Sequence, residues 1–137
     1  GSTLTHELGH YLSLYHTHNG ATGSNPELVN GTNCTTAGDE LCDTPADPTL
    51  CASSGCANYV NTSCVYTGTT TDPNGQLYTP DPTNIMSYSR KSCRTFLSSG
   101  QYNRSNYSAI NVNDYYPNGN YWNEKEIGFN SYSFTRK

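Results

Sequence analysis

The chain contains few of the residues that build a large hydrophobic core. Leucine, isoleucine, valine and phenylalanine together make up 19 of its 137 residues, which is less than the roughly 20% below which disorder becomes plausible. Disorder also requires a strong net charge, whereas the formal net charge here is only −4 and 13% of the residues are charged. Twelve tyrosines and six cysteines can supply aromatic packing and cross-links instead. We therefore expect one folded domain with a thin, cross-linked core.

Long apolar runs and basic stripes are also missing. No stretch approaches the ~18 consecutive apolar residues of a membrane-spanning helix, so we expect no membrane span. The seven lysines and arginines are scattered, apart from Arg90, Lys91 and Arg94, and this argues against a nucleic-acid partner. A secretion signal is not visible. However, only five residues precede the first motif, so a targeting segment would lie upstream.

The cysteines form an even set in a region rich in turn-forming residues. They are Cys34, Cys42, Cys51, Cys56, Cys64 and Cys93. No CxxC spacing occurs, so we favour disulfides over the alternative of a second zinc site. Six cysteines allow many pairings, and the connectivity stays open. Disulfides would imply an oxidising compartment.

The most specific motif is His6-Glu7-Leu8-Gly9-His10. On an α-helix, positions i and i+4 differ by only about 40° around the axis, so His6 and His10 can hold one metal ion between them. Glu7 then lies beside the metal, where a general base for water belongs. The motif therefore predicts a catalytic zinc site.

A third ligand at His16 requires the helix to stop. Ten further helical residues would carry His16 roughly 15 Å along the axis from His6, whereas a zinc to nitrogen bond is only about 2 Å. The helix must therefore end between about His10 and Leu12, and the chain must turn back. The usual turn residue is glycine, but Ser13 is present. A left-handed serine costs on the order of 1 to 2 kcal/mol, so either Ser13 bears that strain or the turn differs.

Two helices are expected. Thr3 or Thr5 can cap the first, which runs to about Leu12. Ser98, with Gln101 three residues later, has the spacing of a capping box and predicts a second helix over about 99–110.

The region between the helices is dominated by turn-forming residues from 19 to 82. We expect long loops there, with short strands at 59–62 and 65–67. A loop region of this length needs disulfides or bound ions to order it. Residues 113–137 are rich in asparagine and aromatic residues. The expected organisation is therefore a domain over 1–112 followed by a tail over 113–137, which either docks on the domain or leads into a further one.

A second motif, Asn84-Ile85-Met86-Ser87-Tyr88-Ser89, lies downstream of the zinc motif. Together the two motifs resemble the metzincin zinc peptidases, which carry a methionine-containing turn beneath the metal. The fuller pattern of HELGHYLSLYHTH, GDELCDTPA and NIMSYSRKSC resembles the pappalysin family, particularly its cytophagalysin-type secreted bacterial branch. The resemblance covers about Thr3 to Ser108.

This resemblance implies roles for individual residues. The zinc ligands would be His6, His10 and His16, with Glu7 as the base, Met86 as the Met-turn methionine and Tyr88 as a tyrosine near the metal. A phenol hydroxyl there can donate to the oxyanion of a tetrahedral intermediate. His18 matches no family ligand, and we expect it at the surface or behind a ligand.

The stretch from Gly38 to Pro45 resembles a calcium loop of the family. Asp39 and Thr44 would supply side-chain oxygens and Leu41 its carbonyl oxygen, with Asp43 as a weaker candidate. Calcium accepts such mixed oxygen ligands. Zinc and calcium are therefore the expected cofactors.

The implied fold is α+β: the C-terminal subdomain of a metzincin-like zincin, with the zinc helix, long loops ordered by disulfides and calcium, and a C-terminal helix. The implied function is a secreted zinc endopeptidase acting on protein or peptide substrates in an extracellular, cell-surface or periplasmic location. Metzincins also carry an N-terminal sheet subdomain that aligns the substrate by strand pairing, for which only Gly1 to Thr5 would remain. The alternative is thus a non-catalytic fragment or binding module stabilised by zinc and calcium.

Overall fold

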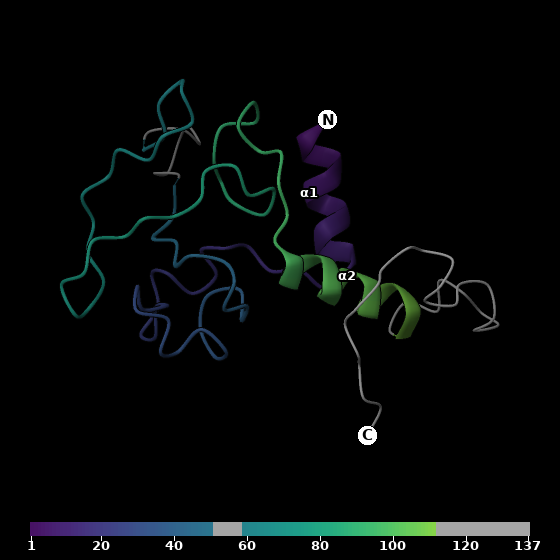
Figure 1. Cartoon of the computed structure of the whole chain (residues 1–137), viewed down its shortest axis with the longest axis horizontal. Coiled ribbons are helices and arrows are strands. Elements are labelled where there is room, and N and C mark those ends of the chain that lie inside the picture. The colour runs from purple at the N-terminus through teal and green to yellow at the C-terminus, as the bar shows by residue number, and fades with distance from the viewer. Residues whose placement is uncertain (51–58, 112–137) are drawn as a thin grey trace.

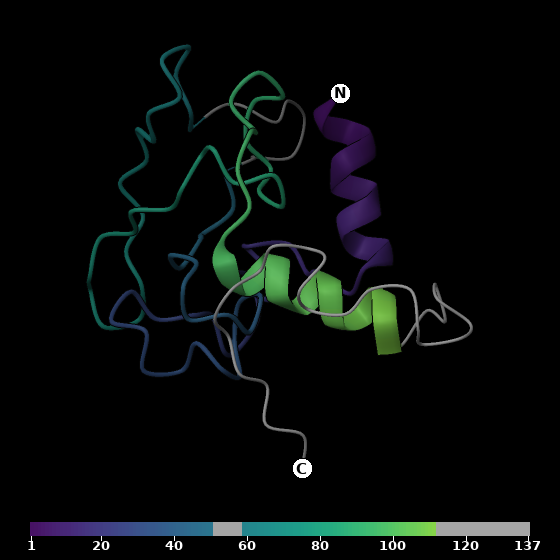
Figure 2. The same ribbon diagram turned by 45° about the vertical axis from the view of Figure 1, so that its right-hand side comes forward.

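The computed structural model describes residues 1–50 and 59–111. Within them lie two helices, α1 (Ser2–Tyr11) and α2 (Ser99–Asn111). The C-terminal end of α1 lies beside α2, and the intervening loops occupy the other side of the molecule (Figures 1 and 2). Among the described residues, no helix combines the length and apolar character that crossing a membrane requires. The predictions for Cys51, Cys56 and the tail over 113–137 concern residues outside the described ranges.

Helix α1 begins earlier than predicted. Gly1 occupies the N-cap position without a side-chain cap, so the expected caps Thr3 and Thr5 were wrong. The reason is that the amides of Leu4 and Thr5 already donate to the Gly1 carbonyl, at 3.1 and 3.5 Å. Helical hydrogen bonding is therefore under way before either threonine could serve as a cap.

The C-terminal end of α1 confirms that the chain turns at Ser13. The Ser13 amide donates to the His10 carbonyl at 3.0 Å, and the Leu14 amide to the Gly9 carbonyl at 2.9 Å. This pair of bonds defines a Schellman motif, whose turn residue takes the left-handed conformation. Ser13 has φ 65°, so a serine bears the strain that glycine would avoid. Its Oγ lies 2.8 Å from the Ser108 Oγ, which ties the turn to α2.

Helix α2 begins with the predicted capping box. The Gln101 amide donates to the Ser98 Oγ at 3.1 Å, and the Ser98 amide donates to the Gln101 Oε1 at 2.9 Å. Gln101 is fully buried, and its side chain also bonds to Asn84 and Asp39. A single cap residue thus connects α2 with two loop segments.

Extended structure is limited to isolated bridges in the described residues. The strands expected at 59–62 and 65–67 were overestimated: they form one antiparallel bridge, Val60 with Tyr66. The side chain of Asn61 accepts hydrogen bonds from the amides of Ser63 and Val65, at 2.9 and 3.0 Å. Because this turn uses amides that a longer ladder would need, the pairing stays short. The described part of the expected α+β fold is therefore two helices with little strand.

Two disulfides support the loops. Cys34 pairs with Cys42, and Cys64 pairs with Cys93. The disulfide prediction is therefore confirmed for these four cysteines. The second bridge belongs to a small core with Leu50, Val60 and Tyr66, so covalent linkage and apolar packing act at the same place.

Candidate metal centre

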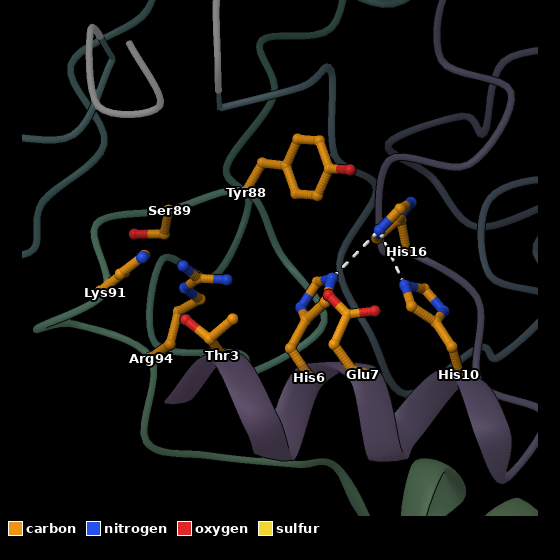
Figure 3. Close-up of a pocket in the computed structure, with 9 residues that line it drawn as sticks. All are labelled: Thr3, His6, Glu7, His10, His16, Tyr88, Ser89, Lys91 and Arg94. Atoms are coloured by element: carbon orange, nitrogen blue, oxygen red, sulfur yellow. Dashed lines mark hydrogen bonds between the residues drawn. The ribbon is translucent and has the colours of Figure 1, made fainter. Parts of the chain in front are cut away.

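Three histidine side chains converge above α1 (Figure 3). His6 and His10 extend from one face of the helix, and His16 approaches from the opposite side after the Ser13 turn. The His16 Nε2 lies 3.1 Å from the His6 Nε2 and 2.9 Å from the His10 Nε2. Their ligand atoms all lie within 4.8 Å of one another. The structure thus brings together the three predicted zinc ligands.

Backbone carbonyls orient two of these rings. The His6 Nδ1 lies 2.7 Å from the Ile85 carbonyl oxygen, and the His10 Nδ1 lies 2.8 Å from the Leu14 carbonyl oxygen. A carbonyl oxygen only accepts hydrogen bonds, so each Nδ1 carries the proton and donates. Each Nε2 then presents its lone pair to the centre. Metal-bound histidines are held by the same kind of bond in proteins.

Burial favours the neutral form of His6 and His16. It lowers the pKa of His6, and burial together with the neighbouring histidines lowers the pKa of His16 to about 4. Neutral imidazole is the form that binds metals. Tetrahedral zinc with bonds of about 2.0 to 2.1 Å would place nitrogen ligands about 3.3 Å apart, close to the separations at His16. The three residues therefore fit a zinc ion.

The histidines line a pocket with a cavity volume of about 530 Å³. Glu7 lies between His6 and His10 on the helix and points into the same space, while Tyr88 overhangs it (Figure 3). The Tyr88 ring centroid lies 4.5 Å from that of His16 and 5.9 Å from that of His6. A carboxylate, a phenol and three nitrogen ligands thus face one cavity.

Comparison with known proteins places this arrangement in a family. The family model Peptidase_M43, described as pregnancy-associated plasma protein-A, matches residues 1–109. The chain belongs to the M43 (pappalysin) metallopeptidases. The resemblance found in the sequence is thereby confirmed. The cytophagalysin-type branch stays a prediction.

The relatives of this M43 chain include extracellular metalloproteases. It is 37% identical to one from Podospora anserina over 107 residues, or 77% of the chain and 28% of the relative. Identity is 37% to one from Verticillium alfalfae (74% and 27%) and 38% to one from Arthroderma gypseum (76% and 28%). The chain thus spans little more than a quarter of these relatives' length. No solved structure matches it significantly.

Met86 lies directly against helix α1, which carries His6 and His10. It is fully buried, and its carbonyl accepts a hydrogen bond from the Thr17 amide at 3.3 Å. A Cβ added at Gly9 would overlap the Met86 sulfur, so the glycine of the motif allows this close packing. The methionine segment and the helix are therefore fitted to each other beneath the histidines.

His18 packs on His16, outside the cluster of three histidines. Its ring stacks on His16, with centroids 4.8 Å apart and planes at 13°, and contacts Tyr88 at 4.5 Å. Burial lowers its pKa to about 4. The geometry matches the expected place behind a ligand, since His18 supports the His16 ring by packing.

The proposed calcium-loop residues also come together. The Asp39 Oδ1 and the Leu41 carbonyl oxygen each lie 2.7 Å from the Thr44 Oγ1. Asp43 points elsewhere and accepts hydrogen bonds from the Ser98 Oγ at 3.0 Å and the Gly100 amide at 2.6 Å. It therefore holds the start of α2.

Sequence reasoning missed two buried acids near this loop. Glu27 and Asp47 are 5% and 4% exposed. Burial and neighbouring carboxylates raise the pKa of Glu27 to about 8, and burial raises that of Asp47 to about 6. Neither residue stands in a motif, and isolated acids in turn-rich sequence are normally solvated. The sequence carried no signal for them.

Proposed function

We propose that the chain supplies the metal centre of a secreted zinc endopeptidase. The observation that carries this proposal is the convergence of the His6, His10 and His16 Nε2 atoms in a cavity that also holds Glu7. A cluster of three nitrogen acceptors, one buried and two half-buried, with a carboxylate alongside is the arrangement of a hydrolytic zinc site. Membership of the M43 family and the names of the relatives support the same reaction.

The side chains take complementary roles. A zinc ion held by His6, His10 and His16 would polarise the scissile carbonyl and the attacking water. The Glu7 carboxylate takes a proton from that water and passes it to the leaving amine. The Tyr88 hydroxyl donates a hydrogen bond to the developing oxyanion. Met86 packs beneath the ligands, and the Ile85 and Leu14 carbonyls hold two of the rings in the binding tautomer.

Peptide hydrolysis by the zinc-loaded protein tests this proposal. We expect cleavage of an internally quenched peptide mixture to cease after chelation and to return when zinc is added back. The reason is that the three histidines contribute to hydrolysis only through the metal ion that they hold. Buffer carried through the same dialysis serves as the control. Activity that persists without detectable metal would contradict a zinc mechanism.

A second candidate is a metal-stabilised module without activity of its own. The short coverage of the relatives and the lack of extended strands in residues 1–50 and 59–111 favour it, because a peptide substrate is commonly aligned by pairing with a sheet edge. Zinc binding without turnover by the 137-residue chain, with turnover by a longer protein that contains it, would select this candidate.

The proposed location is outside the cytoplasm. Two disulfides and the extracellular metalloproteases among the relatives support secretion. We also propose that the domain extends to about residue 112 and that the segment 113–137 follows it as a tail. The family match ends nearby, at residue 109.

We further propose that calcium binds at Asp39, Leu41 and Thr44. The Thr44 hydroxyl has one proton and can satisfy only one of the two oxygens that lie 2.7 Å from it. Nearby, the Glu27 Oε2 is buried without a hydrogen-bond partner in the described residues. The Asp39 Oδ1 also accepts a hydrogen bond from the Leu41 amide at 3.1 Å, so the support comes from the unpartnered Glu27 oxygen and the excess negative charge around it, which favour a hard cation.

This proposal predicts an unusual pH dependence of stability. The folded-state pKa of Glu27, about 8, lies above its ordinary value of 4.5. Without calcium, its stabilising contribution is therefore complete below about pH 4.5 and is lost as the pH rises toward 8. Millimolar calcium should reverse that loss, because the cation stabilises the ionised form.

Thermal unfolding at several pH values, with zinc constant and calcium present or absent, measures this effect. In calcium-free buffer, Glu27→Gln should reduce the fall in unfolding temperature that accompanies the rise in pH toward 8. The Glu40→Gln variant, altered at an exposed acid, should behave like the unmodified chain. An unfolding temperature indifferent to calcium at pH 8 would refute the calcium site.

A further inference from the structure

Two cationic side chains form one wall of the metal pocket. Lys91 and Arg94 line it together with the three histidines and Glu7. In Figure 3 they lie beside His6, at the N-terminal side of the zinc motif and away from His10. The chain has a net charge of −4 and only seven lysines and arginines, so two cations in this cavity run against its overall charge balance.

Arg94 differs from its nearest counterparts in its contacts. The Arg90 Nε donates to the Val60 carbonyl at 2.7 Å, and Arg104 donates to the carbonyls of Asp39 and Glu40. The Arg94 Nε is buried and has no hydrogen-bond partner among the described residues. Arg90 and Arg104 therefore have structural roles that the contacts explain, whereas Arg94 does not.

A buried donor without an acceptor costs free energy, and a charged one costs more. Within the described residues, the pocket offers Arg94 no carboxylate in ion-pair contact, since Glu7 belongs to the metal side of the cavity. Guanidinium presents a planar set of donors that matches a carboxylate in a bidentate pair. Because the half-buried Arg94 side chain lines the pocket, its guanidinium is placed to meet an acceptor on a group that enters the cavity.

We propose that Arg94, assisted by Lys91, binds a carboxylate of the peptide substrate beside the bond to be cleaved. The proposal rests on the proposed function, because the metal centre fixes where that bond lies. The carboxylate can belong to an acidic side chain or to the C-terminus of a peptide. A basic side chain in the same place would be repelled by Arg94, by Lys91 and by a zinc ion held by the three histidines. Such a substrate is therefore disfavoured.

Matched peptides separate the two sources of the carboxylate. One series carries glutamate or its isostere glutamine at each position flanking the cleaved bond, and a second carries a free or amidated C-terminus. With the zinc-loaded protein, we expect kcat/KM to be about tenfold higher for the carboxylate-containing member of one series. A preference in the first series assigns the side chain, and one in the second assigns the chain end.

Variants test whether Arg94 is the cause. The ratio compared is kcat/KM for the carboxylate-containing peptide divided by kcat/KM for its neutral partner. Arg94→Gln should bring this ratio close to one, and Arg94→Lys should retain part of the preference. Arg94→Glu should instead favour peptides that carry lysine in place of glutamate. Lys91→Gln, at an exposed position, should reduce the ratio less than Arg94→Gln. Equal cleavage of all matched peptides by the unmodified protein would overturn the proposal, as would a ratio unchanged in Arg94→Gln.

A binding measurement separates this proposal from the proposed function. Fluorescent versions of the same peptides are titrated against the zinc-loaded Glu7→Gln variant, in which turnover is not required. A carboxylate preference of about tenfold in Kd, lost on adding Arg94→Gln, supports the site even if the unmodified protein cleaves nothing. Cleavage without such a preference supports the peptidase but refutes the carboxylate site.

Discussion

Glu7→Gln is expected to lower kcat for peptide hydrolysis by about 10²- to 10⁴-fold, the range that a positioned general acid and base contributes. Glutamine has the same shape but cannot take the proton from water. Glu7 is exposed in the pocket and does not belong to the histidine cluster, so zinc content should stay the same. Stopped assays on quenched peptides, with metal analysis of the same preparations, measure both quantities.

The matched control is Glu40→Gln. Glu40 is also exposed but lies in the loop next to Asp39, outside the metal pocket. The same loss of one negative charge there should leave kcat within about twofold of its value in the unmodified protein, as expected for surface substitutions. If Glu7→Gln retained full activity, proton transfer would have to be assigned to another group and the proposed mechanism would be wrong.

His16→Ala should abolish stable zinc binding. It removes the ligand whose Nε2 lies 3.1 and 2.9 Å from the other two and leaves two nitrogens on one helix. Losing a group that merely orients a ligand costs about 10- to 100-fold in affinity, so losing the ligand itself should cost more. Competition with a chromogenic zinc chelator gives the dissociation constant directly.

His18→Ala is the control for this substitution. His18 is stacked on His16 with centroids 4.8 Å apart, yet it stands outside the three-histidine cluster. Its removal should weaken zinc binding by no more than about 100-fold, the cost of a supporting group, and zinc should remain near one per chain when the metal is in excess. Equal losses in the two variants would show that His18 is itself a ligand and that the ligand set is wrong.

The predicted features that the structure reproduces are mostly local in sequence. The spacing of His6 and His10 determines their common helix face, and the capping box at Ser98 depends on residues three positions apart. The turn at Ser13 follows from chain reach, because His16 can meet the other histidines only if the helix ends early. Such arguments need no knowledge of the rest of the fold.

The features that could not be predicted depend on contacts between distant segments. Asp43 lies in the expected calcium loop, but it caps α2, whose first residues follow more than fifty positions later. The burial of Glu27 and the pairing of Cys64 with Cys93 depend likewise on how the loops pack. No local pattern specifies these partners, since turn-forming residues leave the path of a loop open.

The turn at Ser13 has a consequence for the entropy of metal binding. The same few residues end α1, supply the Leu14 carbonyl that holds the His10 ring and reverse the chain so that His16 faces the other ligands. Most of the conformational freedom of two ligands is therefore already lost when the helix end folds. Ordering them a second time is unnecessary, so the ion is expected to bind a preorganised site with a small entropic penalty.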